Sequence, residues 1–198
     1  ESGERYSARF VIDTSGVLAN PHIPGIQGSE SFKGPIFHSG HWDHSVACEG
    51  KRVGVIGSGC SAAQIVPAIA GKVSRLTLFM GKAQWILPRS DRHYGAVERF
   101  VRTLPGIRHL IRWLVFGFYD LRFIAFRRYP GISGMSRLMK DHYRRRLKKH
   151  LDKYIKDDKL RQHMMPDYEL GCRRVIPTNA YLPALSLDNV DADISGIE

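Results

Sequence analysis

The feature that most constrains the fold is a glycine turn placed directly between a strand pattern and a helix pattern. Residues 52–56 are mostly β-branched or apolar and lead straight into the turn 57–62, whose sequence is Gly-Ser-Gly-Cys-Ser-Ala. An alanine-rich helical segment over 61–70 follows, and 76–79 is an apolar strand pattern. Apolar strands of this kind are typical of parallel sheets covered on both faces. The sequence therefore predicts a parallel βαβ unit in an α/β fold.

The turn matches the pattern GxGxxA in the strand-to-helix context that gives this pattern its meaning. The first glycine allows a tight turn, the second lets a pyrophosphate approach the backbone, and the alanine lets the helix pack closely. The helix N-terminus adds N–H groups and a positive dipole end. The alternative is a glycine turn that binds nothing. We predict a Rossmann-like dinucleotide-binding domain that contacts its cofactor through Gly57, Ser58, Gly59, Cys60, Ser61, Ala62 and Gln64.

The choice between NADPH and NADH depends on the residues at the end of the second strand, where an acidic side chain would hold a free ribose. This stretch, 79–82, reads Phe-Met-Gly-Lys and contains no carboxylate. The absence of an acid, together with Lys82 and Arg75, favours NADPH because a carboxylate would repel a 2′-phosphate. A solvated surface role for Lys82 stays open as the alternative.

The formal net charge of +11 over 198 residues makes an anionic partner worth considering: nucleic acid, a membrane surface or a phosphorylated cofactor. A nucleic-acid-binding module would use the basic stretch between Arg127 and Lys153, but no aromatic-basic sheet motif or recognition-helix signature supports it. We expect no nucleic-acid partner. The three cysteines are far apart and no targeting signal is evident, which favours a reducing, cytoplasmic location without a disulfide framework or zinc-thiolate site.

A helical insertion is predicted over 97–162, with breaks at 105–106 and 130–131. Its most apolar stretch, 110–126, is interrupted by charged residues and glycine, so it does not resemble a transmembrane span. Burial against the rest of a larger protein is the favoured interpretation. Peripheral contact with a membrane surface is the alternative.

The two ends of the chain contain only short strand patterns. Residues 8–13 read as a strand that runs into a Pro/Gly-rich loop over 20–28, and 166–198 read as short strands and turns. The resulting three or four strands are fewer than in a typical sheet. We therefore expect the chain to be a truncated portion of a larger protein.

The segment 32–43 resembles the fingerprint FxGxxxHxxxW[P/D] of Baeyer–Villiger flavin monooxygenases at every specified position, namely Phe32, Gly34, His38, Trp42 and Asp43. Relatives that oxidise nitrogen or sulfur usually have Tyr in place of this Trp. The resemblance implies a linker that couples the movements of the FAD and NADPH domains. A metal site at the three histidines spaced three residues apart over 38–44 is disfavoured by the nearby glycine and proline, so we predict no metal.

The resemblance extends over almost the whole chain. It implies that the turn at Thr14, Ser15 and Gly16 lies near FAD. Residues 171–174 resemble the G-x-[KR]-R segment of the family, which implies that Arg173 clamps the 2′-phosphate and that Arg174 is the catalytic arginine. A permanently charged guanidinium suits the second role because negative charge develops during oxygen transfer. One departure is Gly81, where the family usually has Arg.

The resemblance also implies a domain plan and an activity. Residues 1–45 would form the linker and edge of the FAD domain, 46–92 the NADPH-binding βαβ unit, 93–165 the helical insertion and 166–198 the return to the NADPH domain. NADPH would reduce FAD, and a C4a-peroxyflavin formed with O₂ would insert one oxygen atom into a ketone or oxidise a nitrogen or sulfur atom. Because the glycine-rich FAD fingerprint is missing, the chain alone is not expected to oxygenate a substrate.

Overall fold

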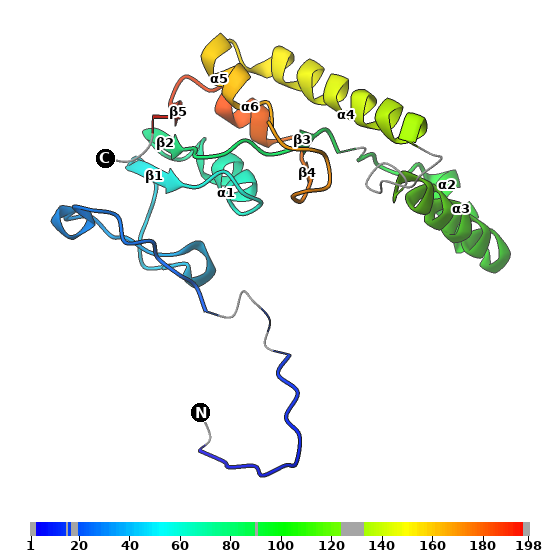
Figure 1. Cartoon of the computed structure of the whole chain (residues 1–198), viewed down its shortest axis with the longest axis horizontal. Helices are drawn as coiled ribbons and strands as arrows, with labels where there is room; N and C mark the ends of the chain where they lie inside the picture. Colours follow the sequence, from blue (N-terminus) through cyan, green and yellow to red (C-terminus); the bar gives the residue numbers. More distant parts are fainter. Residues whose placement is uncertain (1–2, 15, 17–19, 90, 124–132, 196–198) are drawn as a thin grey trace. The chain divides into compact units, whose positions relative to one another are not determined.

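The computed structural model describes residues 3–14, 16, 20–89, 91–123 and 133–195, and the chain divides into two units, Glu1–Ala47 and Cys48–Ile197. The first unit contains two short 3-10 helices, η1 (Ser29–Ser31) and η2 (Ser39–His41). The second unit contains the helices and strands labelled in Figure 1.

The strand predicted over 8–13 is absent from the described part of the first unit. These residues are extended without strand pairing, and the side chains of Phe10, Val11 and Ile12 are almost fully exposed. The prediction is therefore wrong for this chain. A strand is defined by hydrogen bonds to a neighbour, and an apolar alternating sequence without such a neighbour cannot satisfy its backbone groups in a sheet.

The main sheet of the second unit is parallel and has the order β1-β2-β5. β1 (Arg52–Ile56) and β2 (Arg75–Phe79) are joined by α1 (Ala62–Ile69), so the predicted βαβ unit is confirmed, including the bounds of its first strand. β5 (Val190–Asp193) pairs with the far side of β2. The chain thus returns from its C-terminal region to place a third parallel strand beside β2 (Figure 1).

The helical insertion is confirmed, and its described residues form α2 (Ala96–Thr103), α3 (Pro105–Phe123), α4 (Ser133–Tyr154) and α5 (Asp158–His163). The predicted break at 105–106 is where α3 begins, and proline is well suited to a first helical turn. The predicted break at 130–131 lies outside the described residues. No helix among the described residues is long and apolar enough to cross a membrane.

A second, two-stranded parallel sheet joins β3 (Ile86–Leu87) to β4 (Ile176–Pro177). The backbone N–H of Ile176 donates to the carbonyl of Trp85 at 2.7 Å. The short helix α6 (Tyr181–Leu185) then leads into β5. This small sheet places the segment after β2 beside the segment before α6, although about 90 residues of sequence separate them.

The core of the second unit lies where α1, α4 and α6 meet the sheet. Leu76 and Leu78 of β2 are fully buried, as are Leu147 and Leu151 of α4. The α4 residues are spaced four apart, so one face of this helix enters the core while its many basic residues remain on other faces. This face of α4 packs against α6 and β3, and α6 in turn packs against α1 of the βαβ unit.

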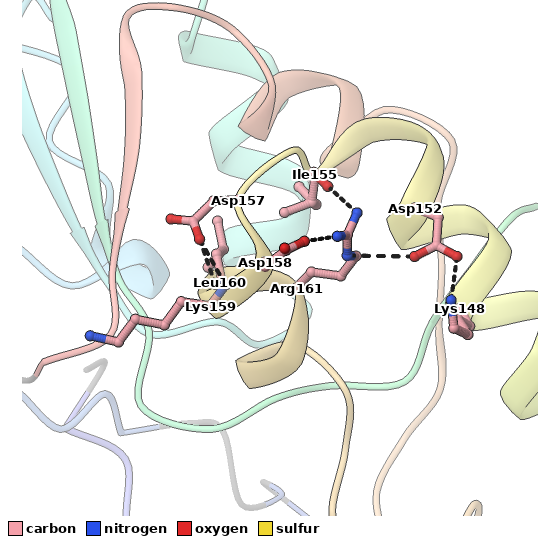
Figure 2. Close-up of polar contacts among 8 residues, drawn as sticks. All are labelled: Lys148, Asp152, Ile155, Asp157, Asp158, Lys159, Leu160 and Arg161. Carbon is pink, nitrogen blue, oxygen red and sulfur yellow. Dashed lines mark hydrogen bonds and ion pairs between the residues drawn. The ribbon is translucent and has the colours of Figure 1, made fainter.

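The junction of α4 and α5 is fixed by polar contacts around Arg161, as Figure 2 shows. Its guanidinium donates to the carbonyl of Ile155 at 3.2 Å, forms an ion pair with Asp152 at 3.5 Å and pairs with Asp158. The carboxylate of Asp157 caps α5 by accepting from two backbone N–H groups in its first turn. These contacts hold the turn that follows α4.

The favoured burial of the apolar stretch 110–126 is not provided by the described residues. Trp113 is 73% exposed and Leu114 is 64% exposed, and most other apolar side chains of α3 are exposed as well. The sequence pattern identified the helix correctly, because its periodicity is local. The pattern did not specify what would cover the helix.

Candidate nucleotide-binding site

The first glycine of the turn has the conformation that the pattern requires. Gly57 has a φ of +107°, a region that L residues rarely adopt, and its N–H donates to the carbonyl of Phe79 at 2.9 Å. This hydrogen bond joins the turn after β1 to the end of β2. The turn therefore lies at the carboxyl ends of the parallel strands, where open α/β sheets place their ligands.

The second glycine lies at an open approach to the backbone. A Cβ atom added to Gly59 would meet no other atom within 4 Å, so this side of the turn is not filled by packed side chains. The carbonyl of Gly59 accepts from the N–H of Ala63 at 3.0 Å, and the side chain of Ser61 does not cap α1. The start of α1 is thus accessible to an anion, while Ala62 and Ala63 pack into the core below.

Two polar side chains of the turn form internal contacts. The buried hydroxyl of Ser58 donates to the carbonyl of Lys82 at 2.7 Å, and the amide of Gln64 donates to the carbonyl of Cys60 at 3.1 Å. In this structure the side chains of Ser58 and Gln64 therefore hold the shape of the turn. Cys60 is exposed on its outer side.

The segment after β2 leads from the turn to the predicted arginine clamp. The hydroxyl of Tyr168 donates to the carbonyl of Ala83 at 3.0 Å, and the indole N–H of Trp85 donates to the carbonyl of Tyr168 at 3.3 Å. The guanidinium of Arg173 lies 5.0 Å from the centre of the Tyr168 ring. Burial raises the pKa of the Tyr168 phenol, so it remains protonated and can donate this bond.

These contacts form a continuous path from Ser58 through Lys82 and Ala83 to Tyr168 and Arg173. The sequence singled out the first, second and last of these residues. It missed the role of Tyr168, whose hydroxyl binds the segment after β2 at Ala83 and whose ring lies against Arg173. No short-range pattern could have found this contact, because Tyr168 and Ala83 are 85 positions apart.

The remaining basic residues near the site have different placements. Lys82 and Gly81 are exposed at the end of β2, and Arg174 is exposed just before β4. Arg75 begins β2, and its Nε donates to Asp191 of β5 at 2.6 Å. The expectation that Arg75 joins Lys82 near a 2′-phosphate is wrong, because Arg75 lies at the opposite end of the strand from the glycine turn.

The fingerprint residues of the first unit form a set of local contacts. A Cβ atom on Gly34 would lie 2.6 Å from the ring of Phe32, so the aromatic ring occupies the space that a side chain at Gly34 would need. The Nδ1 atom of His38 accepts from the N–H of Gly40 at 3.0 Å. The ring of Trp42 packs edge-to-face on a neighbouring phenylalanine at position 37, with 5.2 Å between ring centres.

Asp43 completes this loop. Its carboxylate accepts from the hydroxyl and from the N–H of Ser45, and these hydrogen bonds lower the pKa of Asp43. No group of three or more potential metal ligands is present among the residues that the structure describes. Thr14 and Gly16 are exposed, with a φ of +79° at the glycine, and Ser15 lies outside the described residues.

The arrangement defines a Rossmann-type dinucleotide-binding domain. It consists of a strand, an open glycine turn, a helix and a second parallel strand with an exposed lysine at its end. Comparison with known proteins agrees with this class. A family model described as flavin-binding monooxygenase-like matches residues 3–104. The chain belongs to this family.

Named relatives cover nearly the whole chain. It is 40% identical over 192 residues to a Baeyer-Villiger monooxygenase of Streptomyces coelicolor, a match that covers 96% of this chain and 36% of the relative. It is 36% identical over 196 residues to a Baeyer-Villiger monooxygenase of Pseudomonas aeruginosa, covering 98% of this chain and 36% of that protein. The chain thus spans just over a third of the length of these curated relatives.

Solved structures share the fold. The polycyclic ketone monooxygenase of the fungus Thermothelomyces thermophila aligns with a TM-score of 0.72 at 23% identity, over 92% of this chain and 36% of that one. Cyclohexanone monooxygenase from Rhodococcus sp. Phi1, solved with bound NADP+, aligns with a TM-score of 0.63 at 21% identity, over 91% and 39% of the two chains.

Proposed function

We propose that the chain is the NADPH-binding part of a flavin-dependent monooxygenase that inserts one oxygen atom of O₂ into a ketone. The observation that carries the proposal is the glycine turn with open space at Gly59, linked by side-chain contacts to Arg173. Relatives at up to 40% identity are named Baeyer-Villiger monooxygenases, which supports the ketone as substrate class. The activity belongs to the complete protein.

The described residues fit a nicotinamide dinucleotide. The positive φ of Gly57 and the open side of Gly59 leave backbone accessible at the start of α1, where a diphosphate would be stabilised by N–H groups and the helix dipole. Lys82 and Arg173 would hold the 2′-phosphate in place of the arginine that the family usually has at Gly81. NADPH supplies the hydride when bound, and FAD supplies oxygen activation.

Arg174 is the residue that we assign to the reaction itself. By the G-x-[KR]-R resemblance it would reach the flavin, where its fixed positive charge stabilises the negative charge that develops as oxygen is transferred. Arg173 next to it is held by the ring of Tyr168 and would orient NADPH. Most of the FAD contacts would come from parts of the protein beyond this chain, with Thr14, Ser15 and Gly16 contributing one turn.

The fingerprint loop would couple the two nucleotide-binding domains. Its support is the location of the boundary between the two compact units, which falls after Ala47 and thus just beyond Asp43. The internal contacts of Phe32, His38 and Trp42 would give the loop a defined shape that transmits movement. We propose the linker and edge of the FAD domain at 1–45, the NADPH-binding βαβ unit at 46–92, the helical insertion at 93–165 and the return to the NADPH domain at 166–198.

An enzyme that oxidises nitrogen or sulfur is the alternative within the same architecture. Trp42 and the names of the relatives favour the ketone. We also infer a cytoplasmic location, supported by three free cysteines that do not pair with one another. Peripheral contact with a membrane through residues 93–165 is proposed as well, supported by the exposed apolar side chains of α3.

The test uses the complete protein with a cyclic ketone and, in parallel, with a thioether. Arg174→Ala is expected to abolish product while NADPH binding remains measurable, because the residue acts on the reaction and not on the diphosphate. Gly59→Asp is expected to prevent NADPH binding through bulk and negative charge. Arg99→Ala on exposed α2 is the matched control for loss of an arginine. Normal oxygenation by the Arg174 variant would refute its role, and preference for the thioether would favour the alternative.

A further inference from the structure

The helix α3 presents an unusually apolar surface to solvent. Among its described side chains, Trp113 is 73% exposed and Leu114 is 64% exposed, and six further large apolar residues are each at least 48% exposed: Leu110, Val115, Phe116, Phe118, Tyr119 and Leu121. Monomeric proteins rarely leave a continuous apolar area of this extent uncovered unless it contacts something. The question is which partner fits its chemistry.

The apolar residues are concentrated on one side of the helix. At 3.6 residues per turn, the positions from Trp113 through Leu110, Leu114 and Phe118 to Val115 span an arc of about 200°. The remaining arc carries Arg108 and Arg112 with His109 and Asp120, and also the aromatic residues Phe116 and Tyr119, while Arg122 falls within the first arc next to Val115. We call the first arc the apolar face of α3.

The neighbouring helix α2 covers a different side. Arg102 of α2 and residues of α3 line a groove of about 510 Å³, and the α3 residues in it are Arg108, Ile111, Arg112, Val115, Phe116 and Tyr119. These belong mainly to the charged arc and its margin. Three leucines of the apolar face do not line this groove and remain exposed: Leu110, Leu114 and Leu121.

The margins of the apolar face carry residues suited to the boundary between lipid and water. Trp113 lies at one margin, and Tyr119 lies just beyond the other, between Arg108 and Arg112 around the helix. Aromatic rings with one polar atom favour the headgroup level of a bilayer, and arginines on the opposite face attract anionic lipids. On α2, Arg102 is paired with Glu98 at 3.0 Å and Arg99 is exposed, so the arginines that would face an anionic surface are mainly those of α3 itself.

We propose that the apolar face of α3 inserts into the interfacial region of an anionic phospholipid bilayer, with the helix lying in the plane of the membrane. The inference rests on the peripheral contact proposed for residues 93–165 and gives it a surface and a lipid chemistry. It does not depend on oxygen transfer. A helix in this position would hold the nucleotide-binding domain at the membrane surface, where apolar ketones partition between the bilayer and water.

The test is co-sedimentation of the complete protein that contains this chain with vesicles of phosphatidylcholine alone and of equal parts phosphatidylcholine and phosphatidylglycerol, because parts of the protein beyond this chain could cover α3. The unaltered chain is expected to sediment with the anionic vesicles at low salt and to be released as salt rises. The double variant Leu114→Asp and Phe118→Asp should lose about tenfold or more in vesicle partition. The control is Leu138→Asp on α4, a leucine that is 67% exposed on another helix, which should bind as the unaltered chain does.

A second measurement separates the lipid from other occupants of the same face. The mass of each variant in solution is determined across a range of concentrations, with circular dichroism as the check on folding. Absence of the unaltered chain from anionic vesicles would overturn the proposal. The proposal would also be overturned if the unaltered chain self-associated and the double variant became monomeric without any change in vesicle partition. The apolar face would then bind a second copy.

The outcome is distinct from that of the proposed function. Gly59→Asp should retain vesicle binding while losing NADPH, and the α3 double variant should retain NADPH while losing vesicles. If only the expectation for NADPH failed, so that Gly59→Asp still bound the cofactor, the result would count against the nucleotide site. If only the expectation for vesicles failed, so that the α3 double variant still bound them, the result would count against the membrane surface.

Discussion

The two glycines of the turn make a sharp prediction because alanine should affect them in opposite ways. Gly57 has a φ of +107°, so alanine there forces a backbone conformation that costs an L residue roughly 1–2 kcal/mol. Gly59 has no such restriction, and its added methyl group would meet no atom within 4 Å. Gly59→Ala should therefore change the free energy of unfolding by no more than about 0.5 kcal/mol.

In cofactor binding, by contrast, we expect a clear effect of Gly59→Ala. The methyl group of Gly59→Ala occupies the open space through which a diphosphate would approach, and we expect a loss of at least about tenfold in NADPH affinity, or ~1.4 kcal/mol. Urea denaturation gives the stabilities, and titration calorimetry gives the affinities. A Gly59→Ala variant that is stable and binds NADPH as tightly as the unaltered chain would refute the assignment of this turn to the diphosphate.

Two further predictions concern α4 and its junction with α5. Burial lowers the pKa of His150 below its ordinary value of 6.5. The unfolded chain therefore takes up this proton first, and the free energy of unfolding should fall as pH drops from about 6.5 toward the lower folded-state pKa. His150→Gln should flatten that decline in urea denaturation at several pH values, whereas His142→Gln on the exposed side of the same helix should leave it unchanged; equal slopes in all three proteins would contradict this role. Arg161→Ala removes the partner of Asp158 and one partner of Asp152, which keeps Lys148, and should cost about 1 kcal/mol, a modest loss because these carboxylates are substantially exposed. A thermal midpoint identical to that of the unaltered chain would show that this network contributes nothing.

The glycine turn and its flanking elements could be predicted from sequence because their signals are local. A short strand with three β-branched apolar residues, a glycine that tolerates positive φ and an alanine-rich helix each specify their own conformation. The same holds for α2 and α3, which periodicity and the proline at position 105 predicted, whereas the break between α4 and α5 was not predicted. Family resemblance added the fingerprint loop, whose contacts are also short in sequence.

Features that depend on distant partners could not be derived in this way. The strand over 8–13 has the composition of a β-strand but no neighbour among the described residues, and α3 has a helical pattern that does not state what covers it. Arg75 is close to Lys82 in sequence, yet a strand of five residues separates them and Asp191 binds the arginine. In each case the local sequence did not specify the neighbours of the segment, and for residues 8–13 the predicted strand itself was wrong.

The amino-acid sequence by itself determined the βαβ unit, the position of its open turn and the set of helices that follow, because hydrogen bonds and side-chain periodicity within a few residues define them. Only the tertiary structure decided that β5 pairs with β2, that the strands at 86–87 and 176–177 form a second sheet, and that Tyr168 contacts both Arg173 and the segment after β2. These contacts join residues some 85 to 115 positions apart. They form because burying apolar surface in the common core offsets the entropy lost in closing such long loops, a balance that no local pattern records.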